Sequence, residues 1–252
     1  MIRIAATADV HFGRDSAGTM RPGLERIDRD ADLLLLAGDL TKAGDPGEAE
    51  VLAAELSDLP VPVVAVLGNH DYHSDRQADV RSAIERAGVT VLEGEWAVVS
   101  VGGADVGIAG GKGFGGGFTG SSGTEFGEPQ MKDFIGHSRF LAENLERALG
   151  RVAEADLVIS LTHYSPVRET LSGESPEIFP FLGTYLLAEA IDRARTDLAV
   201  HGHAHHGSEK GVTPGGVNVR NVAMPVLRRP YAVYGFERSR GHPDTRVRAL
   251  VD

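Results

Sequence analysis

The stretch Asp32-Leu-Leu-Leu-Leu-Ala37-Gly38-Asp39 indicates how this chain is built. Five apolar residues in a row, 33–37, predict a short strand that is buried on both faces, as strands of parallel sheets are. Gly38 and Asp39 follow at once. Gly-Asp alone is an ordinary turn dipeptide, but the carboxyl end of a buried strand is where open α/β sheets bind ligands. The stretch therefore predicts a sheet whose carboxyl edge carries the function.

The same arrangement recurs on both sides of this stretch. Residues 2–8 form an apolar run that ends at Asp9, and residues 62–67 form another that ends at Gly68-Asn69. The interval from Asp9 to Asp39 is 30 residues, and so is the interval from Asp39 to Asn69. Each interval is long enough for a strand, a helix and a return. The chain therefore begins with repeated βα units.

The rest of the chain changes from βα units to a β-rich tail. Helical spacing predicts helices over residues 22–31, 46–57, 74–87 (with Ser74 as the cap), 138–153 and 185–194. β patterns are expected at 89–92, 96–101, 105–109, 156–161, 198–200, 217–222, 231–236 and 246–251. Residues 110–127 are expected to form one glycine-rich loop, and residues 166–183 an irregular segment. Two packed sheets flanked by helices fit this order, in a single domain over residues 1–252.

Composition narrows the class of protein. The 252 residues are 42% hydrophobic, enough for a sizeable core, and carry a formal net charge of −11. Such an acidic chain disfavours binding to nucleic acid without excluding it, because Lys and Arg supply most phosphate contacts. The absence of cysteine excludes disulfides and thiolate ligands. With no signal-peptide pattern and no long apolar run, we expect a cytoplasmic protein that does not enter a membrane.

Five polar signatures follow predicted strands, and they combine carboxylate, imidazole and amide groups. They are Asp9-Val-His11, Gly38-Asp39, Gly68-Asn69-His70-Asp71, Thr162-His163 and Gly202-His203-Ala-His205. These are the donor types that hard or borderline metal ions bind in the absence of thiolate. Alternation along an extended segment would bring both members of a pair such as Asp9 and His11 to one site. Because residues at strand ends meet at one sheet edge, the series predicts a metal centre there.

The ordered series resembles the calcineurin-like metallophosphoesterase family. The pattern of that family is D-x-H, G-D, G-N-H-D or G-N-H-E, a later H, and G-H-x-H, and the match here spans residues 9–205. The resemblance implies a four-layer αββα sandwich of two mixed sheets flanked by helices, with a dinuclear metal site at the carboxyl ends of strands. It also implies two ligand sets that share Asp39. The sets are Asp9, His11, Asp39 and His205, and Asp39, Asn69, His163 and His203.

The resemblance implies a mechanism as well. A hydroxide shared by two divalent or mixed-valence metal ions would attack phosphorus. His70 would protonate or stabilise the leaving oxygen, and Asp71 would orient that histidine or its loop. Manganese or iron is the expected metal, with zinc as an alternative. His201 alternates with His203 and His205, but the motif does not select it, and we expect it to pack behind the ligands.

The stretch from Gly38 to Asp45 bears on the subgroup. It lacks the Asp-Arg pair of the family's protein phosphatases and resembles bacterial phosphodiesterase-type members, which favours diester hydrolysis of a small phosphate ester. Two alternatives remain at this stage. Asp-Val-His-Phe-Gly13 is similar to the opening motif of repair nucleases, and some relatives of this fold serve as non-catalytic interaction scaffolds. Residues 110–127 are either a flexible connection or a lid over substrate.

Overall fold

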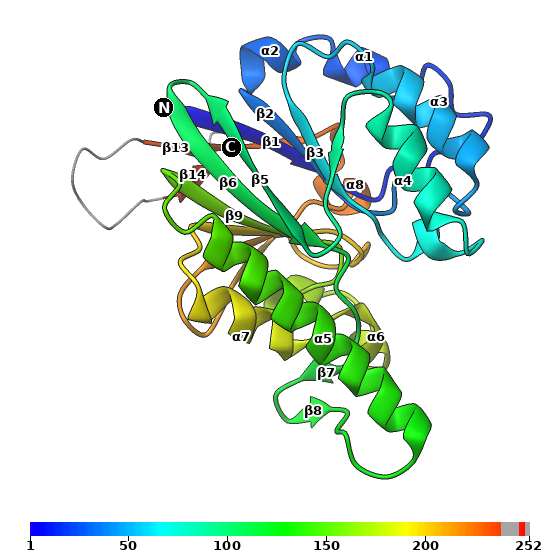
Figure 1. The fold of residues 1–252 in the computed structure, drawn as a ribbon, viewed down its shortest axis with the longest axis vertical. Coiled ribbons are helices and arrows are strands. Elements are labelled where there is room, and N and C mark those ends of the chain that lie inside the picture. Colours follow the sequence, from blue (N-terminus) through cyan, green and yellow to red (C-terminus); the bar gives the residue numbers. More distant parts are fainter. Residues whose placement is uncertain (238–246, 250–252) are drawn as a thin grey trace.

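The computed structural model describes residues 1–237 and 247–249 and contains two six-stranded sheets that pack against each other (Figure 1). The strand order of the first sheet is β14 (Val247–Ala249), β13 (Ala232–Phe236), β1 (Ile2–Thr7), β2 (Leu33–Ala37), β3 (Val63–Val66), β4 (Thr90–Val91). Strands β1 to β4 run parallel, and β13 runs antiparallel to β1. The carboxyl ends of β1, β2 and β3 therefore meet at one edge.

The second sheet has the same mixed character. Its strand order is β11 (Lys210–Val212), β12 (Asn218–Asn221), β10 (Leu198–His201), β9 (Leu157–Thr162), β6 (Ala104–Gly111), β5 (Glu95–Val101). The four inner strands are parallel, and only the edge strands β11 and β5 pair in the antiparallel sense. β9 and β10 end at the same edge of the molecule as β1 and β2, because residues at their ends are hydrogen-bonded across the sheets.

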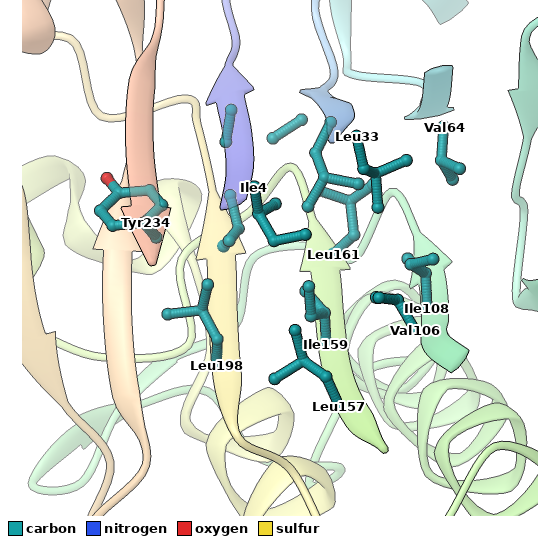
Figure 2. Packing of buried hydrophobic residues seen from close by; sticks show 14 of the residues in the cluster. Ile4, Leu33, Val64, Val106, Ile108, Leu157, Ile159, Leu161, Leu198 and Tyr234 are labelled. Atoms are coloured by element: carbon teal, nitrogen blue, oxygen red, sulfur yellow. The ribbon is translucent and has the colours of Figure 1, made fainter. Parts of the chain in front are cut away.

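The main core lies between the two sheets. Ile4 and Leu33 of the first sheet face Leu157 and Ile159 of the second, and Tyr234 fills the side of β13 (Figure 2). All five are at most 1% exposed. The near-continuous apolar runs of β2 and β9 follow from this position, because their other faces are covered by helices.

Helices form the two outer layers. α3 (Pro46–Leu56) and α4 (Gln77–Glu85) cover the outer face of the first sheet, and α5 (Pro129–Arg151) and α7 (Tyr185–Arg193) cover that of the second. α3 begins where the sequence predicts, because Asp45 caps it through the Gly47 N–H and Pro46 occupies the first turn. The αββα sandwich of two mixed sheets is thereby confirmed.

Three predicted helices differ from the structure. Residues 22–31 form two separate short helices, α1 (Arg21–Leu24) and α2 (Ile27–Asp30), in a stretch whose proline and glycine are poor helix formers. Ser74 does not cap α4, since its hydroxyl donates to Ala43 O. α5 begins at Pro129 rather than 138, and only Ile135 is buried in its first nine residues. That end projects from the sandwich (Figure 1), yet Met131, Phe134 and Ile135 are apolar at helical spacing there, so the predicted start at 138 was too late.

Residues 110–127 are not one structureless loop. They contain a small hairpin, β7 (Gly117–Phe118) and β8 (Ser121–Ser122), and Gly117 N donates to Gly183 O. Residues 166–183 were predicted to be irregular, but more than half of them form the short helices η2 (Glu169–Leu171), η3 (Pro176–Ile178) and α6 (Phe179–Leu182). Of the predicted strand 246–251, only Val247–Ala249 is among the described residues. No helix within residues 1–237 and 247–249 has the length and apolar character that crossing a membrane requires.

Candidate metal centre

The predicted ligands converge at the carboxyl ends of β1, β2, β3, β9 and β10. Backbone hydrogen bonds tie the loops that follow these strands to one another. Asp9 N donates to Gly38 O at 3.0 Å, His11 N to Asp39 O at 3.0 Å, and Gly202 N to His163 O at 3.2 Å. Segments far apart in sequence are thus held as one surface.

A first group of donors consists of Asp9, His11, Asp39 and His205, whose donor atoms all lie within 4.8 Å of one another. His205 Nε2 is 2.8 Å from Asp9 Oδ1 and 3.4 Å from His11 Nε2. His11 Nε2 is in turn 3.7 Å from Asp39 Oδ2. Two carboxylates and two imidazoles therefore point into one small space.

A second group consists of Asp39, His163 and His203, again with donor atoms within 4.8 Å. His163 Nε2 lies 3.2 Å from Asp39 Oδ1 and 3.0 Å from Asn69 Oδ1, so the amide oxygen of Asn69 belongs to the same cluster. Asp39 faces the first group with Oδ2 and the second with Oδ1. All seven side chains that the sequence predicts as ligands are therefore brought together, with Asp39 between the two groups.

The convergence does not come from alternation along an extended segment, which was the wrong expectation. Asp9, His11, Asp39 and His203 have φ values of 59°, 43°, 50° and 69°. Non-glycine residues rarely adopt this left-handed region, and it is enriched at functional sites because the surrounding structure must hold it there. Sharp left-handed turns after β1, β2 and β10 therefore aim these side chains inward.

Two glycines make this close packing feasible. A Cβ on Gly68 would lie 2.1 Å from Asp39 Oδ1, and one on Gly38 would lie 2.6 Å from His163 Nδ1. Gly38 also has a φ of +87°, which suits glycine. The Gly-Asp and Gly-Asn signatures thus owe their glycines to the crowding around Asp39 and His163.

Backbone carbonyls orient the histidines of the second group. His163 Nδ1 lies 2.8 Å from Ala37 O, and His203 Nε2 lies 3.2 Å from Phe181 O. Each carbonyl accepts the N–H of one ring nitrogen, so the opposite nitrogen keeps a lone pair for a metal, an arrangement typical of ligating histidines. Sequence reasoning missed both contacts, because a carbonyl is present at every residue and carries no signal.

The charges of the centre fit bound cations. The side chains of Asp9 and Asp39 are 0% and 1% exposed, and their ion pairs within the described residues are all to histidines. Although burial opposes it, the charge and hydrogen bond of His163 hold the pKa of Asp39 well below its usual range. Burial would lower the pKa of His163, but Asp39 raises it to about 9. Buried carboxylates facing oxygen and nitrogen donors are the environment that a divalent cation requires.

His70 lies at the rim of the first group. Its Nδ1 is 2.7 Å from Lys42 O, which accepts that N–H, and its Nε2 is 4.0 Å from Asp39 Oδ2. The ring stands edge-on to that of His11, 4.5 Å between centroids, and the side chain is 43% exposed. The free Nε2 is therefore within reach both of the centre and of solvent.

Asp71 acts on the loops, and its carboxylate is fully buried. It accepts hydrogen bonds from Leu40 N, from Thr41 N and Oγ1, and from Gly68 N, at 2.6–3.1 Å. Burial raises its pKa, against the effect of these donors. Asp71 thus joins the loop after β2 to the loop after β3, which favours the loop-orienting role over a direct contact with the His70 ring.

His201 uses both ring nitrogens inside the protein. Nδ1 lies 2.7 Å from Gly202 O and Nε2 lies 2.8 Å from Thr170 Oγ1. The side chain is fully buried, and burial lowers its pKa to about 4. A neutral histidine with no free lone pair on the ligand side has a packing role, as the motif indicates.

Open space adjoins the first donor group. A cavity of about 510 Å³ is lined by His11, His70 and His205 together with Gly13, Asp15, Ser16 and Lys42. A larger cavity of about 710 Å³ lies between α7 and the segments around η2 and β11, and none of the predicted ligands lines it. The smaller cavity is therefore the one through which a ligand would approach the centre.

Comparison with known proteins supports the geometry. The family model for calcineurin-like phosphoesterases matches residues 2–207. A probable cyclic nucleotide phosphodiesterase from Synechococcus is 46% identical, but over only 43 residues, which is 17% of each chain.

Two solved structures share the fold. Phosphopantetheinyl hydrolase (PptH) from Mycobacterium tuberculosis superposes with a TM-score of 0.61 at 16% identity, covering 95% of this chain and 96% of that one. GAP50, the anchor in the inner membrane complex of Plasmodium, superposes with a TM-score of 0.57 at 13% identity, covering 100% and 89%. With a family model that spans most of its length and a centre built from the family's motifs, the chain belongs to the calcineurin-like phosphoesterases.

Proposed function

We propose that this protein is a dinuclear metal-dependent phosphoesterase that prefers phosphodiesters. The observation that carries the proposal is the pair of donor groups on either side of Asp39, each with its donor atoms within 4.8 Å. Two cations held this way suit an in-line displacement at phosphorus. Asp9, His11, Asp39 and His205 would hold one ion, and Asp39, Asn69, His163 and His203 the other.

The donor set favours manganese or iron, with zinc as the alternative, since it offers oxygen and nitrogen and no sulfur. When bound, such ions lower the pKa of water to give a nucleophile and offset the charge on phosphoryl oxygens. The residues of the chain orient the ligands and the loops that carry them. The carbonyls of Ala37 and Phe181 fix two of the ligand rings, and Asp71 fixes the loop that carries Asp39.

His70 supplies the proton for the leaving oxygen. The Lys42 carbonyl accepts the Nδ1–H, so Nε2 is the nitrogen that exchanges a proton with substrate. Its position between Asp39 and the cavity of about 510 Å³ supports a leaving group that departs into that cavity. General acid catalysis of this kind typically contributes about 10²–10⁴-fold.

Three observations favour a diester. The chain keeps His11 and lacks the Asp-Arg pair of the family's protein phosphatases. The short match to a probable cyclic nucleotide phosphodiesterase points the same way.

The test is hydrolysis of bis(p-nitrophenyl) phosphate against p-nitrophenyl phosphate by the manganese-loaded protein. We expect the diester to have the higher kcat/KM. His70→Ala should lower kcat by about 10²–10⁴-fold while metal content stays at the wild-type value. His73→Ala, on the exposed surface beyond η1 (His70–Tyr72), is the matched control and should retain both. Loss of metal in His70→Ala, or unchanged turnover, would contradict the assigned role.

A further inference from the structure

A buried ammonium group stands beside the second donor group. Lys112 directly follows β6, and only 8% of its surface is exposed. Its Nζ lies 5.0, 4.9 and 5.2 Å from the ring centroids of Tyr72, Phe114 and Tyr164. These rings attract a cation through their faces, but they cannot accept its hydrogen bonds as an oxygen would.

The hydrogen bonds of this ammonium are incomplete. Nζ donates to Gly113 O at 3.1 Å, and within residues 1–237 and 247–249 that is its one acceptor, so two of its three donors have no partner. Glu93 acts on Lys112 through its charge, but the Glu93 carboxylate accepts its hydrogen bonds from Tyr72 Oη and Leu67 N. Burial lowers the pKa of Lys112 to about 8, against the pull of Glu93 and Asp39. A buried, incompletely bonded cation is unfavourable unless a further group satisfies it.

The position of Lys112 relates it to the metal centre. Its carbonyl accepts hydrogen bonds from His163 N and Tyr164 N, each at 3.1 Å. The Tyr164 ring lies 4.4 Å from the ring of His203, and Tyr72 is two residues after His70. Tyr164, one of the three rings around the ammonium, therefore adjoins the second donor group, and the charge of Asp39 acts on Lys112 as well. The cavity of about 510 Å³ adjoins the first group.

We propose that Lys112 Nζ binds an anionic oxygen of the phosphoryl group held at the second donor group and so fixes the orientation of the substrate. The proposal rests on the proposed phosphoesterase function. The ligand is a phosphate-ester anion, and the inorganic phosphate that monoesters release shares the same chemistry. An ammonium in a poorly hydrated site makes a strong charge-assisted hydrogen bond to such an oxygen. The alternative is a purely structural role for Lys112 as the counter-charge of Glu93, and the experiment must distinguish this role from phosphate binding.

Isothermal titration of the manganese-loaded protein with inorganic phosphate is the experiment. Lys112→Met keeps the side-chain volume and removes the charge, and we expect it to weaken phosphate binding by at least about tenfold, because a hydrogen bond to a charged group is typically worth that much. KM for the diester should rise more than kcat falls. Lys132→Met, which removes an exposed lysine from α5, is the matched control and should change neither.

A compensated variant keeps the test decisive if Lys112→Met folds poorly. Lys112→Met with Glu93→Gln removes the charge of Lys112 together with the opposite charge that acts on it, so stability should return toward the wild-type value. Phosphate affinity should remain at least about tenfold weaker in this double variant if Lys112 contacts the anion. If affinity returns together with stability, or if the single variant binds phosphate as the wild type does, the lysine is structural and the proposal is wrong.

The two proposals fail in different ways. A manganese-loaded wild type that hydrolyses no phosphoester overturns the proposed function, yet the phosphate titrations still compare Lys112→Met with the wild type. A wild type that hydrolyses diesters while Lys112→Met keeps full phosphate affinity overturns only the role of the lysine.

Discussion

The two donor groups share Asp39 but differ in how firmly the fold holds them. In the first group, the side chains of His11 and His205 are 24% and 35% exposed. Within residues 1–237 and 247–249, neither ring has a hydrogen-bond partner outside the group. In the second group, His163 is fully buried, and a backbone carbonyl orients both His163 and His203.

This difference indicates that the two donor groups have different roles at the same sheet edge. The second group is preorganised by contacts that exist without any ion, as ligand-orienting carbonyls do in other metal sites. The first group borders the cavity of about 510 Å³ that also contains His70. We infer that the buried side contributes to the stability of the fold, and that the open side meets the leaving group.

The largest expected difference between the groups concerns stability without metal. His163→Ala should lower the free energy of unfolding of the metal-free protein by about 3–5 kcal/mol, because it removes the closest ion pair of the buried Asp39 and the one fully buried partner. His205→Ala should cost about 1 kcal/mol or less, since the His205 side chain is 35% exposed and water can take its place beside Asp9. Urea denaturation of both variants after chelation measures the difference, and equal costs would remove the distinction between the groups.

A smaller effect is expected at Asp71, which supports the shared ligand from behind. Asp71→Asn replaces one accepting oxygen with a donor that faces backbone N–H groups, so we expect a loss of about 2–3 kcal/mol of unfolding free energy. The metal-loaded Asp71→Asn protein should keep far more turnover than His70→Ala, because the Asp71 side chain does not touch the reacting atoms. Turnover as low as that of His70→Ala, measured on folded and metal-loaded protein, would give Asp71 a direct catalytic role instead.

The sequence predicted which residues form the centre better than it predicted the backbone geometry that brings them together. Apolar runs ended by Asp9, Asp39 and His163 place these residues at strand ends, because the pattern of burial determines where the strands lie. The left-handed turns at His11 and His203 could not be predicted, since they depend on packing between loops from different strands.

Two other features, the start of α5 and the surroundings of Lys112, were predicted incompletely or not at all. The first turns of α5 bury little, but Met131, Phe134 and Ile135 are apolar at helical spacing, so a start before residue 138 could have been predicted. Lys112 did leave a trace, because it follows β6 as the ligands follow their strands. A lone lysine in a glycine-rich stretch nevertheless does not indicate that Tyr72, Phe114 and Tyr164 will enclose it.

The central claim is that Asp39 links two metal sites in one hydrolytic centre, and metal content measured together with diester hydrolysis tests it most directly. The wild type, loaded with manganese and freed of excess, should hold two ions per chain and hydrolyse bis(p-nitrophenyl) phosphate. Asp39→Ala, prepared in parallel, should lose affinity at both sites and reduce hydrolysis to background, because Oδ1 and Oδ2 face different donor groups. A wild type that binds at most one ion per chain, or an Asp39→Ala protein with full activity, would contradict the account.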